Sequence, residues 1–511
     1  MTNNNTPAED LEKLRILDRE RMHLCRAAAL LQWDQETYLP PGGAEERAEQ
    51  LAVLEGVAHD KFTSPEFGGL LDKLGEVKDA GFLQSAPDGF PVSGFLRALK
   101  HDYDKAVKLP GGFVRECARA EGLSQAAWVA ARKQNDFAAF APHLEKMIGF
   151  AKQKAGYWGW EKERLYDGLL DSFEPSYGVK EIAAVFNPLR DRLQLMLKKI
   201  TAKQAGSLAW KGNYSIAKQE SFCREMMAGI GFDFGRGRLD ISAHPFTTTL
   251  GFNDVRVTTR YAPADPLSAL FSVIHECGHA FYELSLDSVL RYSSLAEGAS
   301  MGIHESQSRL WENVIGRSRP FWEPWFPRLQ EHFPNELGET CFDVFYRQLN
   351  NVSPGPIRVE ADELSYSLHI ILRFELEKKL FSGELSVNDL PAAWNAAMKE
   401  YLGVECANDA EGVLQDVHWS MGAFGYFPSY ALGNLYGLQF WGKLKEDCGN
   451  MDEALEKKEY GAIHAWLKEN IHRKGRSALP AELIKEVTGR PLSADDFSDY
   501  IEHKYTELYG L

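Results

Sequence analysis

The sequence predicts an all-α protein that is mainly helical and carries one small β-hairpin. Apolar residues recur at three- and four-residue intervals through most of the 511 residues, which is the spacing of one helical face. Proline and glycine clusters separate these segments, and only one segment alternates Thr and Val as strands do. Hydrophobic residues make up 44% and charged residues 25% of the chain, as in ordinary globular proteins, so intrinsic disorder is excluded.

The helices follow one another along the first two hundred residues. Thr6-Pro7 opens the first, because Pro suits the first helical position, and the cluster from Leu39 to Gly43 ends it. Residues 85–91 carry Pro, Asp and Gly and are expected to form a loop. Further helices are predicted over residues 44–59, 95–107, 112–136, 140–156 and 179–204.

The predicted hairpin lies between Arg238 and Pro263. Thr and Val alternate with other residues on both sides of a turn at Gly251 to Asp254. Helical patterns then continue to the end of the chain, without a repeat or a flexible linker. Length alone favours three or four domains. The pattern instead predicts a single large helical domain over residues 1–511, with two lobes.

Charge and cysteine usage narrow the class of protein. The formal net charge of −16 argues against a nucleic-acid binder, whose surface is usually basic. The seven cysteines are scattered, without a C-x-x-C pair, which is typical of reduced thiols inside cells. There is no signal-peptide pattern and no apolar stretch near 18 residues. We therefore expect a cytoplasmic protein with no membrane or nucleic-acid partner.

The strongest chemical signal is an H-E-x-x-H motif. Asp265-Pro266 is a helix start, and His275, Glu276 and His279 follow on that helix. Two histidines four residues apart share one helical face and can bind one metal ion, while the glutamate beside them can act as a general base toward a metal-bound water. A helix with two buried histidines and a salt-bridged glutamate is the alternative interpretation.

A catalytic zinc site needs three protein ligands and one open position. The metzincin pattern would require Gly and His where this chain has Tyr282 and Ser285, so that pattern is excluded. The third ligand is then expected from the following helix. We predict that this helix begins at a capping box formed by Ser294 and Glu297 and stops near Gly316.

Three acids on this helix are candidates, and Glu305 is favoured. Gly298 and Gly302 lie one turn apart and allow close helix approach, and Glu305 is about one turn beyond them. Glu297 is predicted to serve as a cap, and Glu312 is predicted to be a solvated charge.

Six motifs occur in order along the chain. They are His244-Pro-Phe246 (H-P-F), Asp254-Val-Arg256-Val-Thr258 (D-x-R-x-T), His275 to His279 (H-E-x-x-H), His304-Glu305-Ser-Gln307 (H-E-S-Q), Ile357-Arg358 to Asp362 (I-R-x-x-A-D), and Gly412 to Trp419 (G-x-x-Q-D-x-H-W). With the opening segment from Leu31 to Gly42, they resemble the carboxypeptidase Taq family of zinc metallocarboxypeptidases. The resemblance covers essentially the whole chain, and no motif position departs from it.

The resemblance implies a neurolysin-like gluzincin fold with a deep groove between two lobes, and a homodimer. It implies release of single amino acids from peptide C-termini, with broad specificity but poor action before a terminal Pro. His275, His279 and Glu305 become the ligands of one Zn²⁺ per subunit, which Co²⁺ can replace. Glu276 becomes the general base.

The resemblance also implies groups that bind the substrate. An exopeptidase must hold the terminal carboxylate, and a guanidinium fork suits it. Arg358 is the favoured clamp and Arg256 the second candidate, although an intrahelical pair of Arg358 with Asp362 is a serious rival. His244 and Gln415 are assigned to substrate binding.

The developing oxyanion needs a donor besides the metal. The Gly- and aromatic-rich stretch after residue 417 offers His418, Tyr426 and Tyr430. A packed ring with a satisfied hydroxyl is the alternative for either tyrosine. Asp416 or Asp362 is expected to orient a metal-bound histidine.

Two other functions remain open at this point. One is an oligopeptidase or dipeptidase on the same fold. The other is a non-catalytic helical scaffold with a vestigial metal site, against which the intact Glu276 argues.

Overall fold

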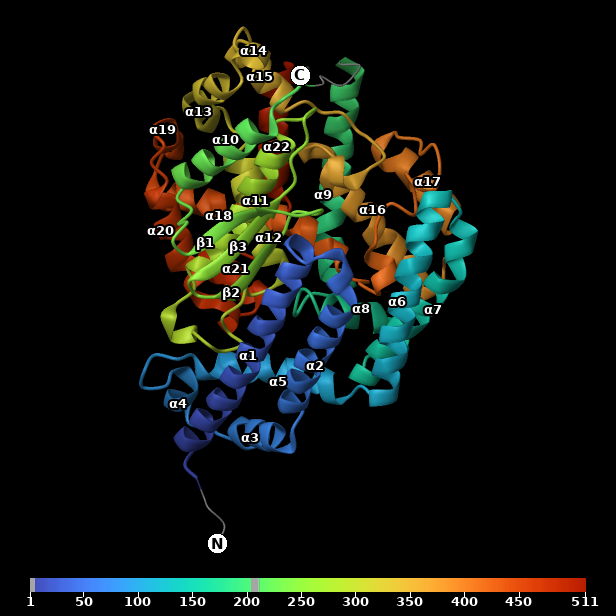
Figure 1. Cartoon of the computed structure of the whole chain (residues 1–511), viewed down its shortest axis with the longest axis vertical. Coiled ribbons are helices and arrows are strands. Elements are labelled where there is room, and N and C mark those ends of the chain that lie inside the picture. The colour runs from blue at the N-terminus through green and yellow to red at the C-terminus, as the bar shows by residue number, and fades with distance from the viewer. Residues whose placement is uncertain (1–4, 204–209, 211) are drawn as a thin grey trace.

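The computed structural model describes residues 5–203, 210 and 212–511, and it is predominantly helical with one small sheet (Figure 1). The all-α prediction is therefore confirmed. The α-helices are α1 Pro7–Thr37, α2 Ala44–Phe62, α3 Pro65–Gly75, α4 Ala80–Gln84, α5 Val92–Val107, α6 Gly111–Gln134, α7 Phe137–Trp158, α8 Leu165–Leu170, α9 Val179–Lys203, α10 Ile216–Gly229, α11 Ser268–Leu284, α12 Met301–Arg309, α13 Arg319–His332, α14 Pro334–Leu337, α15 Phe342–Leu349, α16 Glu363–Ser382, α17 Leu390–Leu402, α18 Phe427–Cys448, α19 Met451–Glu456, α20 Gly461–Asn470, α21 Pro480–Thr488 and α22 Asp495–Tyr509.

Short helical turns connect several of these helices. The 3₁₀ turns are η1 Pro41–Gly43, η2 Lys162–Arg164, η3 Ser288–Leu290, η5 Arg358–Glu360, η6 His418–Met421 and η7 His472–Ser477. A π-helical turn, η4 Leu310–Ile315, continues α12. No helix among the described residues has the length and apolar character that a membrane crossing requires.

The helices predicted in the first two hundred residues are present. Thr6 caps α1: its side chain accepts a hydrogen bond from the backbone N–H of Glu9, and the Glu9 carboxylate accepts one from the Thr6 N–H. Helices α1 and α2 run side by side, as do α6 and α7 (Figure 1). Residues 85–91 form a connection without a helix. Residue 204, the predicted end of the helix that begins at residue 179, lies outside the described residues.

The sheet differs from the predicted hairpin. Strands β2 (Thr247–Gly251) and β3 (Asp254–Thr259) form the expected antiparallel pair around the turn. The predicted first strand, however, is two strands, because the chain leaves the sheet after residue 241. The additional strand β1 (Gly237–Ile241) pairs with β3 in parallel, so the order is β1-β3-β2. The β3 strand is central, and it packs against α11.

The start of α12 corrects a second prediction. The helix begins at Met301, with Ser300 as its cap accepting from the Ile303 N–H, and no capping box forms at Ser294. The Ser294 hydroxyl and N–H instead donate to the buried carboxylate of Asp18 on α1. Ser294, the first residue of the S-x-x-E pattern, therefore pairs with an acid that is distant in sequence instead of capping a helix.

Helix α12 lies between α11 and α18. A side chain at Gly278 of α11 would meet the carbonyl oxygen of Gln307 and the Cα of Ser308 at 2.5 Å. A side chain at Gly433 of α18 would meet the Glu305 Cγ at 2.5 Å. These two glycines permit the close approach. Of the two glycines predicted to do so, Gly298 lies before the helix, whereas Gly302 lies in α12, where a side chain would meet the Glu174 carboxylate at 2.6 Å and the Tyr436 ring of α18 at 3.2 Å.

The core is continuous along the chain. Buried apolar side chains form one cluster that extends from Leu11 on α1 to Tyr509 on α22. The largest fully buried side chains include Trp311, Trp322 and Trp394. The described residues therefore share one apolar core.

We predict that Gly278→Ala destabilises the protein by about 1–3 kcal/mol, because backbone atoms of α12 must move to accept the new methyl group. The measurement is the thermal midpoint at a fixed scan rate. Gly122→Ala is the matched control, since Gly122 is exposed in α6 and a Cβ there meets no atom within 4 Å. The control should keep or raise the midpoint. Equal midpoints for both variants would contradict the packing account.

Candidate active site

Helices α11 and α12 bring two histidines and one carboxylate together. Ligand atoms of His275, His279 and Glu305 all lie within 4.8 Å of one another. Glu305 Oε2 is 3.7 Å from His275 Nε2 and 3.4 Å from His279 Nε2. The spacing of four residues puts the histidines on one face of α11, and the close approach of α12 sets the carboxylate opposite them.

Two imidazoles and one carboxylate are a donor set that catalytic zinc sites use. Ligands about 2.0–2.1 Å from a tetrahedral zinc ion are themselves about 3.3–3.4 Å apart. The 3.4 Å between Glu305 Oε2 and His279 Nε2 agrees with that spacing, and the 3.7 Å to His275 Nε2 is slightly longer. Both histidines are partly exposed while Glu305 is buried, so solvent can reach the imidazole side of the cluster.

A carboxylate orients His275. Its Nδ1 lies 2.7 Å from Glu312 Oε2, so Nδ1–H donates to Glu312 and Nε2 is left as the metal-binding atom. The prediction that Glu312 is a solvated charge was wrong, because its side chain is only 15% exposed. The prediction that Asp416 or Asp362 fills this role was also wrong for this histidine.

A second histidine orients His279. His279 Nδ1 is 2.6 Å from His304 Nδ1, and His304 Nε2 is 2.8 Å from Glu283 Oε1. With His279 Nε2 turned toward Glu305, the proton on its Nδ1 is donated to His304, which in turn donates from Nε2 to Glu283. The relay fixes the tautomers of both rings. Burial lowers the pKa of His279 to about 4, which favours the neutral, metal-binding form.

The other oxygen of Glu305 is held by an arginine. Arg309, one turn along α12, donates from Nε to Glu305 Oε1 at 2.7 Å and from Nη1 to Glu312 Oε2 at 3.2 Å. The Ser308 hydroxyl contacts Glu305 Oε2 at 3.1 Å. One guanidinium therefore fixes the carboxylate that faces both histidines and the carboxylate that orients one of them.

Glu276 lies beside the histidines and contacts the sheet. Its Oε2 accepts a hydrogen bond of 2.6 Å from the hydroxyl of Thr247, the first residue of β2. Burial raises the pKa of Glu276, which makes its carboxylate a stronger base than that of a free glutamate. The Thr247 hydroxyl also lies 2.9 Å from the Glu276 carbonyl oxygen, so its single proton has two acceptors on this residue.

Arg358 pairs with Asp416 and not with Asp362, the alternative partner considered from the sequence. It sits in η5, and its Nε and Nη2 both contact Asp416 Oδ1, at 3.0 and 2.8 Å. Asp362 instead caps α16 by accepting the Ser365 N–H. The rival intrahelical pair of Arg358 with Asp362 does not form, because a 3₁₀ turn and then a helix cap separate them.

Gln415 holds the backbone around Arg358. Its Oε1 accepts the Arg358 N–H at 2.9 Å, and its Nε2 donates to the carbonyls of Pro356, Glu411 and Gly412. The amide is 9% exposed and fully occupied by backbone groups. It therefore positions the loop rather than offering a free group to a peptide.

The three oxyanion candidates form one aromatic cluster. His418 Nε2 lies 3.2 Å from the Tyr430 hydroxyl, and the Tyr426 and Tyr430 rings meet edge to face with centroids 5.0 Å apart. Burial lowers the pKa of His418 to about 4 and raises that of Tyr426 to about 12. At neutral pH the histidine is neutral and Tyr426 keeps its proton, which leaves a hydroxyl donor.

Tyr366 joins the arginine clusters. Its hydroxyl is 3.3 Å from Arg358 Nη1, and the Arg309 guanidinium lies over its ring, 4.2 Å from the centroid. Since Arg309 holds Glu305, one aromatic side chain separates the Arg358 pair from the metal-binding cluster. That arrangement suits a ligand whose negative end and hydrolysed bond are close together.

The remaining two candidates lie at the sheet. Nε and Nη2 of Arg256 donate to the two carboxylate oxygens of Asp254, each at 2.9 Å. The guanidinium lies 4.2 Å from the Trp33 ring centroid. His244 is exposed, and its carbonyl accepts from Ser242. In the described part of the chain, neither residue forms a hydrogen bond or ion pair with His275, His279 or Glu305.

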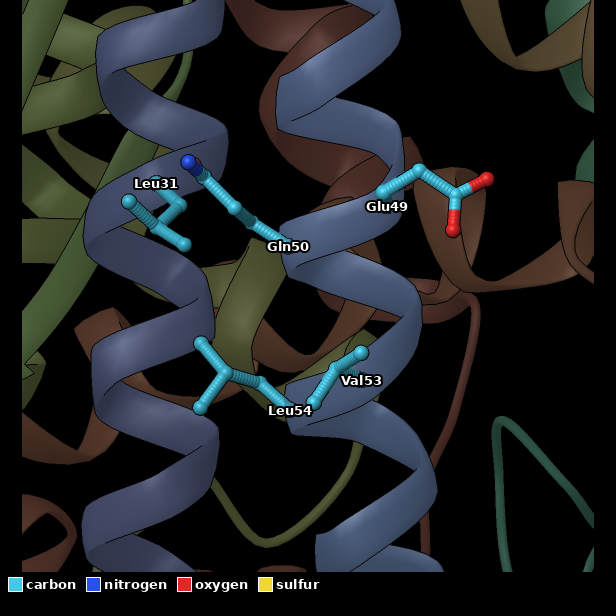
Figure 2. Close-up of a pocket in the computed structure, with 5 residues that line it drawn as sticks. All are labelled: Leu31, Glu49, Gln50, Val53 and Leu54. Carbon is cyan, nitrogen blue, oxygen red and sulfur yellow. The ribbon is translucent and has the colours of Figure 1, made fainter.

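A hollow between α1 and α2 lies apart from this chemistry. Figure 2 shows Leu31 and Leu54 among the side chains along it, with Glu49 pointing away. None of the residues that line it belongs to the site described above.

Comparison with known proteins decides the family. The sequence profile of the carboxypeptidase Taq (M32) metallopeptidase family matches residues 13–505. Carboxypeptidase 1 of Bacillus subtilis (strain 168) is 42% identical, with 96% of each chain covered. Thermostable carboxypeptidase 1 of Thermus thermophilus is 37% identical over 99% of this chain and 100% of that one. The chain belongs to the carboxypeptidase Taq (M32) family.

Solved structures agree. The M32 carboxypeptidase from Deinococcus radiodurans R1 superposes with a TM-score of 0.94 at 37% identity, covering 98% of this chain and 100% of that one. The Pyrococcus furiosus carboxypeptidase superposes with a TM-score of 0.92 at 36% identity, covering 97% and 99%. This chain is a metal-dependent carboxypeptidase, a hydrolase that acts on peptides.

Sequence reasoning missed several polar residues of this metallocarboxypeptidase site. Glu312 follows Glu305 by seven residues, two helical turns, so a shared face was available as a signal. Glu174 offered none: it accepts hydrogen bonds from Ser300, the Gly302 N–H and Tyr436, and so anchors the start of α12 from a distant loop. Burial raises the pKa of Glu174 to about 7.

We predict that Glu312→Gln weakens metal binding about 10- to 100-fold, because His275 loses the charged acceptor that fixes its ring. Competition with a chromophoric chelator measures the affinity. Glu405→Gln is the control, since that side chain is 77% exposed. Unchanged affinity in Glu312→Gln would remove this carboxylate from the metal site.

Proposed function

We propose that this metallocarboxypeptidase uses zinc to release single amino acids from peptide C-termini, with broad specificity and poor action before a terminal Pro. The observation that carries the proposal is the cluster of His275, His279 and Glu305, with Glu276 beside it and the Arg358 pair one aromatic ring away. Co²⁺, which accepts the same ligands, is expected to substitute for zinc.

His275, His279 and Glu305 hold the metal in this proposal. A bound zinc ion supplies a Lewis acid and lowers the pKa of its water toward about 7. Glu276 accepts the proton of the attacking water on its carboxylate and later delivers it to the leaving amine. Thr247 keeps that carboxylate in place through its hydroxyl.

Arg358 is assigned to the terminal carboxylate. Asp416 occupies its Nε and one N–H of Nη2, and Tyr366 contacts Nη1; the other N–H groups have no partner among the described residues. Tyr430, with His418 behind it, and Tyr426 are the donors proposed for the oxyanion.

Arg256 and His244 are proposed to lie farther along the peptide, at the sheet edge, which can pair with an extended substrate. Gln415 contributes to substrate binding through the loop that carries Arg358.

We further propose one domain over residues 1–511 with two lobes flanking the groove, a homodimer, and a cytoplasmic location. The continuous core supports the single domain, and the seven free cysteines support a reducing compartment. The dimer rests on the family resemblance alone.

An oligopeptidase or dipeptidase on the same fold is the second candidate, and product analysis separates them. Metal-loaded protein is incubated with N-blocked peptides, and the products are identified by mass spectrometry. Stepwise loss of C-terminal residues, stopped by a chelator, supports the proposal; internal cleavage overturns it.

Glu276→Gln is expected to lower kcat about 10²–10⁴-fold while leaving the metal bound, since an amide takes no proton but does not disturb the ligands. Metal content and the steady-state rate are measured on the same sample. A variant that keeps its rate would exclude Glu276 as the base.

Arg358→Ala should impair hydrolysis of free-carboxylate peptides far more than that of the matching amides, because only the carboxylate meets the lost guanidinium. The readout is the ratio of kcat/KM for acid and amide. Equal losses on both substrates would remove Arg358 from the clamp role.

A further inference from the structure

Arg358 belongs to a buried group of three charges. Asp416 contacts Arg358 through Oδ1, and through Oδ2 it contacts Arg373 of α16, at 2.7 Å from Nε and 2.5 Å from Nη2. Among the described residues, no other carboxylate lies within 4.0 Å of either guanidinium. Two positive charges therefore share one negative charge.

The neighbouring ionisable groups do not neutralise this excess positive charge. Glu377, one turn beyond Arg373, is directed to other donors: its carboxylate accepts from Tyr166, Trp419 and the Gly425 N–H. Burial raises the pKa of Glu377 to about 7, so it is only partly ionised at neutral pH. His418 is neutral, as described above.

His369 adds no charge either. It is fully buried one turn before Arg373, and burial lowers its pKa to about 3. Its backbone carbonyl accepts from Arg373 Nη1 at 2.8 Å. The buried group is thus close to one net positive charge, which is costly away from water unless an anion is bound.

The two arginines differ in what can reach them. The Arg373 side chain is 0% exposed, with its guanidinium 4.6 Å from the Trp394 ring centroid and 5.4 Å from that of Phe427. The Arg358 side chain is 8% exposed and borders Tyr430. A ligand can therefore contact Arg358, while Arg373 acts on it only through its charge.

We propose that Arg373 is a specificity residue for the free C-terminal carboxylate: by sharing Asp416, it keeps Arg358 from being neutralised, so that the peptide's terminal carboxylate supplies the second negative charge. This inference rests on the proposed role of Arg358. A simple Arg–Asp pair would be neutral and would attract an acid little more than an amide. The second arginine converts that pair into an anion site.

The test compares two ligands on one protein. Metal-loaded Glu276→Gln protein, whose expected turnover is slowed about 10²–10⁴-fold, is titrated calorimetrically with an N-blocked peptide acid and with its C-terminal amide, and the peptides are checked for cleavage afterwards. Arg373→Met removes the charge and keeps an apolar side chain of similar length; Arg373→Gln is a second neutral variant; Arg373→Lys keeps the charge. Metal content and thermal midpoint verify the fold of each.

The acid preference is the ratio of the two dissociation constants. It should fall about 30-fold in Arg373→Met and Arg373→Gln, as expected for one charge roughly 8 Å away at an effective dielectric of about 20. Amide affinity should change less than about threefold. Arg373→Lys should retain the parent's preference within about threefold.

Two results would overturn the inference. One is an unchanged acid preference in the neutral variants, and the other is a loss in Arg373→Lys equal to that in Arg373→Met, which would indicate packing rather than charge. Arg358→Ala in the same background separates the two claims. If it keeps the acid preference, the clamp itself is wrong; if it loses the preference while Arg373→Met keeps it, only the role of Arg373 is wrong.

Discussion

The close packing of α12 between α11 and α18 is the constraint on which the site depends. Glu305 faces the two histidines of α11 because Gly278 lets the backbones of the two helices touch, and because Gly433 of α18 leaves room for its side chain. A side chain at either glycine would occupy space that α12 now fills, so the geometry of the metal-binding cluster is set by helix contact before any ligand chemistry applies. The carboxylate of Glu174 then fixes where α12 begins.

Around this packing the buried charges separate into two regions of opposite sign. Near the histidines, Glu305 and Glu312 share one arginine, Arg309, and the excess is negative, which favours a divalent cation. Near η5 and α16, Arg358 and its neighbour on α16 share one aspartate, and the excess is positive. Tyr366 lies between the two regions. A peptide C-terminus has the complementary arrangement, with a polarisable carbonyl next to a carboxylate, so the overall acidity of the chain conceals a local cationic site.

The sequence anticipated the parts of the site that local spacing determines. His275 and His279 needed only helical periodicity, and the antiparallel strands needed only their turn. Glu305 was chosen correctly as the residue that meets the histidines, but for a partly wrong reason, since Gly298 precedes α12. Contacts across the fold were out of reach: Asp416 lies 58 residues from Arg358, and no local pattern announces that pairing. The residues of β1 were assigned to the first strand of the hairpin, and the parallel pairing was missed because no local pattern marks where the chain leaves the sheet after residue 241.

The central claim is that one metal ion is held by the cluster where α11 and α12 meet. Crystals of the zinc-loaded protein, measured at the zinc absorption edge, test it most directly. The account predicts a single strong anomalous peak per chain, about 2.0–2.2 Å from His275 Nε2, His279 Nε2 and a Glu305 oxygen. A peak at other side chains, or zinc held without Glu305, would contradict it.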